Sequence, residues 1–183
     1  MRYRLLTLGQ TGVTAGGAPV DFPVGKPFGI LVYLAQSGDP VPREDLAALF
    51  WPADERTRAR HSLRQALSFL RQQLGEDVFT SDDPTALDPS RVGSDVEDLR
   101  EALEAGSVDR ILDLYRGPFL ATFQLPGSPA WDHWVESERR VVEERVARSL
   151  RSAAEAAATP ERAEALLRRG VAIEPHRIRH RSA

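Results

Sequence analysis

One segment, from Arg56 to Leu74, holds five arginines and no carboxylate in a chain whose formal net charge is −3. With about 100° of helical turn per residue, its polar side chains fall on one face and its apolar side chains on the opposite face. All the polar groups on that face can donate hydrogen bonds, as the groups that read base edges in a DNA major groove do. The candidates for reading bases are Arg58, His61, Gln65 and Ser68.

Arginines beside this polar face give a second kind of chemistry. A guanidinium can hold a phosphate oxygen, which positions a protein on DNA without reading its sequence. The candidates for phosphate or flanking contacts are Arg56, Arg60, Arg64, Arg71 and Arg91. The opposite face is apolar and we expect it to be buried; it consists of Ala59, Leu63, Ala66, Leu67, Leu70 and Leu74.

Other interpretations of this arginine-rich face stay open. Of the 24 basic residues only Lys26 is a lysine, a bias typical of a GC-rich genome, so the face can also be explained as an ordinary solvated surface. An RNA or an acidic protein would suit the same charge. A solvated helix face usually mixes charges of both signs. The absence of carboxylates here favours contact with DNA.

The elements expected to position this helix follow from periodicity and turn residues. Strands are predicted at residues 2–8, 11–15 and 18–24, the last two joined by a Gly16-Gly17 turn. Helices are predicted at 26–38, 43–51 and 54–74, and a hairpin between 78 and 92. Strands, three helices and a hairpin in this order are typical of a winged helix-turn-helix, whose third helix is the recognition helix.

The remainder of the chain is predicted to be helical, so the fold class is mainly α (α+β) with a small antiparallel sheet. Helices are expected at 96–105, 108–115, 129–157 and 160–173. Their expected N-caps are Ser107, Ser128 and Thr159. A boundary near Asp95 would separate a winged-helix DNA-binding domain at 1–95 from a helical domain at 96–183.

Two stretches resemble a known family of bacterial regulators. Trp51-Pro52 followed by residues 56–75, with the core Ser62-Leu63-Arg64-Gln65-Ala66-Leu67, resembles the recognition-helix region of regulators that carry a bacterial transcriptional activator domain (BTAD). These are antibiotic-pathway regulatory proteins with an OmpR-like winged helix. A second stretch resembles the start of the BTAD itself. Its matching residues are Tyr115-Arg116-Gly117-Pro118-Phe119-Leu120, Phe123, Leu125-Pro126, Trp131, Trp134-Val135-Glu136 and Glu138-Arg139. The resemblance covers roughly residues 3–175.

The resemblance implies a function and partners. Members of the family bind DNA sequence-specifically, usually at direct repeats near promoters, and activate transcription. Double-stranded DNA is therefore the implied partner, with RNA polymerase and a second copy in a homodimer as further candidates. The resemblance also implies a tetratricopeptide-like helical domain and a wing at 78–92. The family's recognition positions fall on Arg58, His61, Arg64, Gln65 and Ser68, and its phosphate positions on Arg60 and Arg71.

The sequence departs from the family in several places. His61 and Phe69 stand where arginine is common, and Phe69 is a candidate for packing against the second domain. The wing carries Asp82-Asp83 and a single basic residue, Arg91, and this composition argues against a minor-groove contact. Family members usually continue with further helices. We therefore expect an incomplete helical repeat, a frayed basic tail from His176 to Ala183, and self-association or a partner at that end.

Most other chemistry is not expected. The absence of cysteine excludes disulfides, zinc–thiolate sites, iron–sulfur clusters and a cysteine nucleophile in this sequence. No phosphate-binding loop or catalytic constellation is recognisable, so we expect neither an enzyme nor a cofactor. One i, i+4 histidine pair, His176 and His180, lies in the expected frayed tail, so no metal site is expected. Without an apolar run of ~18–20 residues or a secretory signal, a cytoplasmic protein is expected.

Two further expectations concern the helical domain. Trp131 and Trp134 are expected in the core, and the glutamates and arginines between 136 and 148 on a solvated, salt-bridged face. The alternative function is a helical-repeat adaptor that binds proteins and keeps a vestigial winged helix. The acidic wing and the net charge of −3 favour this alternative.

Overall fold

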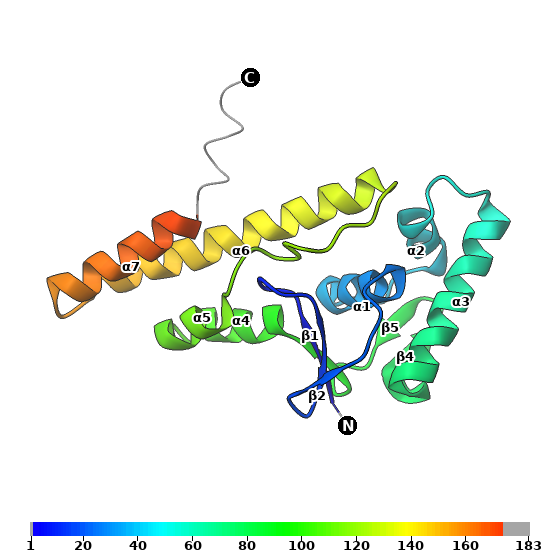
Figure 1. Cartoon of the computed structure of the whole chain (residues 1–183), viewed down its shortest axis with the longest axis horizontal. Helices are drawn as coiled ribbons and strands as arrows, with labels where there is room; N and C mark the ends of the chain where they lie inside the picture. The colour runs from blue at the N-terminus through cyan, green and yellow to red at the C-terminus, as the bar shows by residue number, and fades with distance from the viewer. Residues whose placement is uncertain (1, 174–183) are drawn as a thin grey trace, which may run out of the picture.

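The computed structural model describes residues 2–173, which form a mainly helical molecule with a small sheet (Figure 1). The strands are β1 (Tyr3–Leu6), β2 (Gly12–Ala15), β3 (Ala18–Val20), β4 (Phe79–Asp82), β5 (Thr85–Leu87) and β6 (Val92–Ser94). The helices are α1 (Lys26–Ser37), α2 (Arg43–Phe50), α3 (Arg56–Leu74), α4 (Asp95–Glu104), α5 (Val108–Leu114), α6 (Pro129–Glu155) and α7 (Pro160–Ile173), with a 3₁₀ turn η1 at Glu76–Val78.

A four-stranded sheet in the order β3-β2-β1-β6 packs over α1. The predicted Gly16-Gly17 turn joins β2 to β3, and both glycines have positive φ. β1 is antiparallel to β2 and parallel to β6, with Tyr3 opposite both Ala15 and Val92. The sequence did not predict β6, and the predicted strand at 18–24 ends at Val20.

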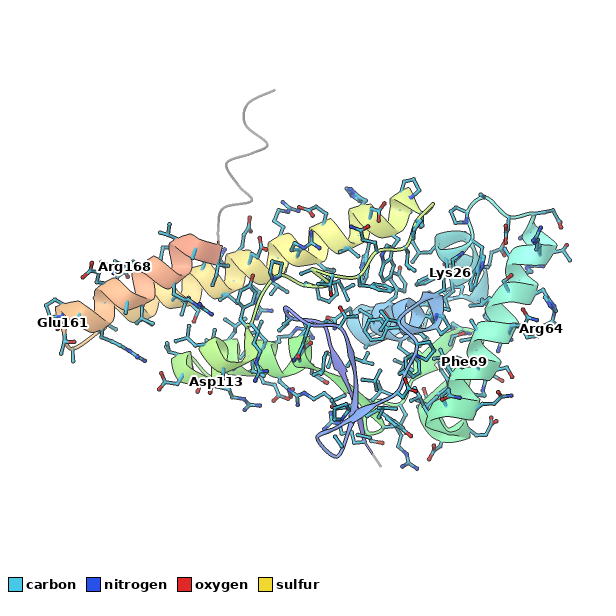
Figure 2. The ribbon with its side chains drawn as sticks, viewed as in Figure 1. Lys26, Arg64, Phe69, Asp113, Glu161 and Arg168 are labelled. Atoms are coloured by element: carbon cyan, nitrogen blue, oxygen red, sulfur yellow. The ribbon has the colours of Figure 1, made fainter. Side chains whose placement is uncertain are left out.

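The helices α1, α2 and α3 and the β4–β5 hairpin form the predicted winged helix-turn-helix. α1 ends at Gly38, which adopts the left-handed conformation that glycine permits. The wing is attached to the helices by a two-way backbone bridge between Val41 and Thr85, with N···O distances of 2.8 and 2.7 Å. α3 lies along the edge of the molecule, with Arg64 projecting outward from it (Figure 2).

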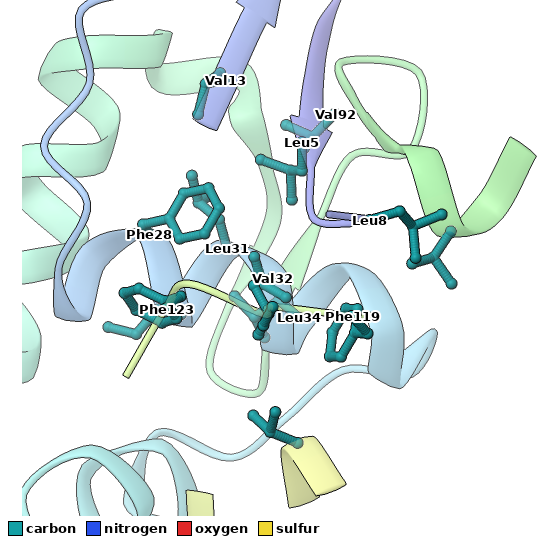
Figure 3. Close-up of a cluster of buried hydrophobic side chains, with 14 of the residues drawn as sticks. Leu5, Leu8, Val13, Phe28, Leu31, Val32, Leu34, Val92, Phe119 and Phe123 are labelled. Carbon is teal, nitrogen blue, oxygen red and sulfur yellow. The ribbon is translucent and has the colours of Figure 1, made fainter. Parts of the chain in front are cut away.

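The core is continuous from the sheet to the C-terminal helices. Leu5 and Val92 pack over α1 from one side, while Phe119 and Phe123 come from the segment between α5 and α6 (Figure 3). The rings of Phe28 and Phe123 meet edge to face, with centroids 5.4 Å apart. Because both halves of the sequence contribute to one core, the C-terminal part holds α1 and α2 in place.

The long helix α6 is fixed at its N-terminal end to the helix-turn-helix. Ser128 accepts a hydrogen bond from Trp131 N (3.3 Å), as an N-cap does, and donates one to Leu49 O of α2 (2.6 Å). Trp131 is 1% exposed and its ring lies 5.2 Å from that of Phe50. Trp134 packs against Tyr33 of α1 at 4.9 Å. The prediction of core tryptophans is therefore confirmed for Trp131, while Trp134 is partly buried and packs against the core.

Three other expectations for the helical part have mixed outcomes. Thr159 accepts a hydrogen bond from Arg162 N (3.3 Å) and caps α7, whereas the Ser107 side chain makes no cap bond. The solvated face predicted on α6 is wrong at Glu143, which is 8% exposed. Burial, and after it the nearby charge of Glu143, raises the pKa of the Tyr115 phenol. The helix α7 folds back along α6 (Figure 1). The basic tail and its two histidines lie outside the described residues.

The junction between the two halves is built on Thr7, Leu8 and Gly9. The Asp95 carboxylate, at the start of α4, accepts hydrogen bonds from Thr7 N (2.7 Å), Thr7 Oγ1 (2.6 Å) and Leu8 N (2.9 Å). On the other side, Leu120 N donates to Thr7 O (2.7 Å). We call this set of contacts the β1 clasp. The division into domains at 1–95 and 96–183 stays a prediction.

Candidate nucleic-acid interface

The apolar stripe of α3 fixes which of its faces is outside. The six residues predicted to be buried are the ones that the structure buries, from Ala59 to Leu74. They pack on α1 and α2, which leaves the opposite side in solvent. The exposed residues of that side are Arg58, His61, Arg64, Gln65, Ser68 and Gln72. The structure thus brings the four base-reading candidates together on one outward surface, which we call the outer face of α3.

The start of α3 differs from the prediction by two residues. The helix begins at Arg56, and Glu55 is its N-cap, with a side chain that accepts a hydrogen bond from Thr57 N (3.2 Å). Asp54 and Glu55 therefore precede the helix and do not form its first turn. The outer face still carries no carboxylate, because both acids stand before it.

The two arginines of the outer face have no carboxylate partner among the residues that the structure describes. Among residues 2–173, neither Arg58 nor Arg64 lies within 4.0 Å of an acidic oxygen. Arg64 Nη2 lies 3.4 Å from Nδ1 of His61, one turn earlier on the same face. A nucleic acid bound there would displace solvent ions from these guanidiniums.

The flanking arginines are paired in this structure. Glu44 of α2 forms ion pairs with Arg56 and with Arg60, the latter at 3.6 Å. Arg91 pairs with Asp77 of η1, beside the sheet and away from the tip of the wing. Exposed pairs such as these contribute only about 0–1 kcal/mol, so they do not prevent an arginine from binding a phosphate instead.

Arg71 is held more firmly than the other flanking arginines. Its guanidinium lies over the ring of Phe79 (5.0 Å to the centroid) and pairs with Asp82 and with Glu76, the latter at 3.7 Å. Only 19% of its side chain is exposed. Arg71 therefore packs between α3 and the wing.

The tip of the wing turns its acids toward the helices. Arg43, the first residue of α2, donates from Nε to the backbone oxygen of Asp82 (2.8 Å). Its backbone N–H donates to Oδ1 of Asp83 (3.2 Å). These contacts place both wing carboxylates beside α2 and α3.

A hollow of about 500 Å³ lies between the start of α2 and the first half of α3. It is lined by Pro42, Arg43, Glu44, Thr57, Arg60, Leu63, Arg64 and Asp83. Arg43 and Thr57 were not among the sequence candidates. The signal for Arg43 was present, since the helix before the recognition helix crosses the DNA backbone in helix-turn-helix proteins.

Two residues near this surface have structural roles. Phe69 packs against Phe22, in the loop before α1, with ring centroids 5.9 Å apart; the expectation that it contacts the second domain is wrong. The reason is that its side of α3 faces the N-terminal half. Burial lowers the pKa of Lys26, against the opposing charge of Asp54, and its ammonium lies 4.7 Å from the Trp51 ring centroid.

Within residues 2–173, no three histidine, aspartate or glutamate side chains gather as metal ligands. In the same range, no helix is long and apolar enough to span a membrane.

Comparison with known proteins shows a likeness of fold. No family model and no curated protein match the sequence. A solved structure of EmbR from Mycobacterium tuberculosis, in complex with a low-affinity phosphopeptide, is similar with a TM-score of 0.54 and 19% identity. The match covers 94% of this chain and 55% of that one, so this chain spans about half the length of EmbR. At this identity the likeness shows the fold: a winged helix-turn-helix followed by a helical part.

Proposed function

We propose that this protein is a sequence-specific DNA-binding regulator of transcription, with α3 as its major-groove helix. One observation carries the proposal: the outer face of α3 is exposed, rich in hydrogen-bond donors and free of carboxylates. Arg58 and Arg64 on this face have no acidic partner among the described residues. A role as an activator, with RNA polymerase as a partner, rests on the sequence resemblance to BTAD regulators alone.

The proposed mechanism uses no covalent chemistry. The buried stripe of α3 holds the helix against α1 and α2, while Arg58, His61, Gln65 and Ser68 meet base edges. Arginine suits guanine and glutamine suits adenine, because each can form two hydrogen bonds to those bases. Arg56, Arg60 and Arg64 take phosphates, as exposed guanidiniums on the flank of a recognition helix do.

The C-terminal helices would set the orientation of whatever they bind. α6 is joined to α2 through Ser128 and through Trp131 packed on Phe50. With about 1.5 Å of rise per residue, its 27 residues span about 40 Å. A second subunit or polymerase bound along α6 and α7 would therefore be held at a defined angle to α3.

The first experiment is selection of random duplex DNA by the purified protein, followed by fluorescence anisotropy at ~50 and ~200 mM salt. Three phosphate contacts predict that affinity falls about 40-fold between these salts. An enriched motif, above all a direct repeat, supports a sequence-specific regulator. If no DNA is bound at low salt, the proposal is wrong and the protein-binding adaptor becomes the better interpretation.

Base reading is tested by Arg58→Ala, with Arg148→Ala on α6 as the matched control that removes the same charge. The loss of Arg58 is expected to cost about 1–3 kcal/mol and to relax one position of the selected motif. The Arg148 variant should bind as the unmodified protein does. An equal loss by the Arg58 variant on every sequence would show that Arg58 holds only phosphate.

A further inference from the structure

We propose that Asp82, at the tip of the wing, restrains DNA binding by occupying two arginines that would otherwise reach phosphates. The inference rests on the proposed function and concerns the strength of DNA binding. It gives the acidic wing of this chain a role: the wing competes with DNA for the flank of α3.

A single carboxylate oxygen joins three elements. Oδ1 of Asp82 pairs with Arg71 of α3 and lies 3.4 Å from Nη2 of Arg43, the first residue of α2. The backbone oxygen of Asp82 also accepts from Nε of Arg43 at 2.8 Å. Arg43 and Arg71 are thus both engaged by the same wing residue.

Asp82 belongs to the flank of α3 that should face phosphates. Arg60, Arg64 and Arg71 lie within about 40° of one another around the helix, because they are spaced four and seven residues apart. The next wing residue, Asp83, lines the same hollow as Arg60 and Arg64. The wing tip therefore puts two carboxylates where the phosphates of a bound duplex would approach.

The contact can be exchanged because its carboxylate lies in solvent, although Arg71 is only 19% exposed and is also paired with Glu76. The side chain of Asp82 is 72% exposed, so solvent and salt screen its attraction to the two guanidiniums. A phosphate that replaces the carboxylate must first break these pairs and then lie near the displaced negative charge. Both effects weaken DNA binding, and neutralisation of Asp82 removes both.

The test compares Asp82→Asn with Asp113→Asn in the intact chain, using anisotropy on the selected DNA. Asp113 is exposed on α5, so its variant makes the same charge change away from α3. Asp82→Asn should bind more tightly than Asp113→Asn at every salt. If one arginine is released to a phosphate, its loss of affinity between ~50 and ~200 mM salt should increase by a further factor of about 3.5.

Two more variants assign the effect to charge and to the named arginines. Asp82→Glu keeps the charge and should bind as the unmodified protein does. In an Arg43→Gln/Arg71→Gln background, Asp82→Asn should give no gain beyond that of Asp113→Asn. Thermal unfolding of each variant checks that the wing is still folded.

Specific outcomes would overturn the inference. These are an Asp82→Asn variant that binds no more tightly than Asp113→Asn, tighter binding by Asp82→Glu, or a gain that survives the loss of both arginines. An unmodified protein that binds no DNA would instead overturn the proposed function itself.

Discussion

Replacement of Asp95 by alanine should destabilise the protein more than any exposed substitution, because Asp95 forms one side of the β1 clasp. Its carboxylate is the acceptor for Thr7 N and Leu8 N, and both residues are completely buried. Without the carboxylate these two donors remain inside the protein with no partner from Asp95. Each unsatisfied buried donor costs about 1–3 kcal/mol, so the expected loss is about 2–6 kcal/mol.

Asparagine at the same position should be tolerated far better. Its amide oxygen can accept both backbone hydrogen bonds, and its NH₂ can donate to Thr7 Oγ1 in place of the bond that this hydroxyl now donates. The comparison of Asp95→Ala with Asp95→Asn therefore separates the hydrogen bonds from the charge. Unfolding in urea measures the stability of both variants. Asp113→Ala is the control, and its free energy of unfolding should lie within about ±0.5 kcal/mol of that of the unmodified protein.

The charge of Asp95 gives the comparison a dependence on pH. Burial raises the pKa of Asp95, against the opposing effects of its hydrogen bonds and of Arg4. A folded-state pKa above the unfolded value means that the native state holds its proton longer. Ionisation of Asp95 therefore reduces stability as pH rises from about 4 through the raised pKa, whereas Asp95→Asn has no such loss. The stability of the unmodified protein relative to this variant should decrease over that range.

Two results would refute this reasoning. A loss of less than about 1 kcal/mol in Asp95→Ala would mean that water or another group satisfies the two N–H donors. A stability difference between the unmodified protein and Asp95→Asn that increases with pH would mean that the folded state favours the ionised carboxylate.

Two further predictions concern the attachment of the C-terminal half. Gly9→Ala should destabilise the protein by about 1–3 kcal/mol in thermal unfolding. The φ of Gly9 is +77°, and a Cβ there would lie 2.7 Å from the backbone carbonyl carbon of Arg116. Gly16→Ala, also at positive φ but in open space, is the matched control, and an equal loss in both variants would assign the effect to φ alone. Ser128→Ala should reduce the free energy of unfolding by about 1–2 kcal/mol, because it removes the cap on α6 and the hydrogen bond to Leu49 O. Thr159→Ala removes only a cap and should reduce it less. The reverse order would contradict the role given to Ser128.

The sequence predicted what local periodicity encodes. The 3.6-residue spacing of Leu63, Leu67, Leu70 and Leu74 gave the buried side of α3, and therefore also the exposed positions of Arg58 and Gln65. N-cap chemistry at Ser128 and Thr159 predicted the first residues of α6 and α7 correctly. The mainly helical class and the winged helix followed from the order of these elements.

Features that depend on distant residues were not predictable in the same way. β6 is only three residues long, and it forms because Val92 meets Tyr3 across 89 positions of sequence. The acids of the wing were evident in the sequence, but only the fold shows that Asp82 turns to Arg43 and Arg71. The need for glycine at position 117 is likewise visible only in the fold, because a Cβ there would lie 2.9 Å from Cα of Gly9.

The β1 clasp also has a consequence for the order in which the protein can fold during synthesis. Thr7, which follows β1, bonds to Asp95 and to Leu120. It therefore emerges from the ribosome long before its partners do. α1, α2 and α3 have local contacts and can form early, whereas closure around Thr7 must wait for residues 95–120. A chain released before residue 120 would leave the Thr7 carbonyl without Leu120 N and the Phe28 side of α1 without Phe123. α3 would then be present, but α1, against which it packs, would lack this part of the core.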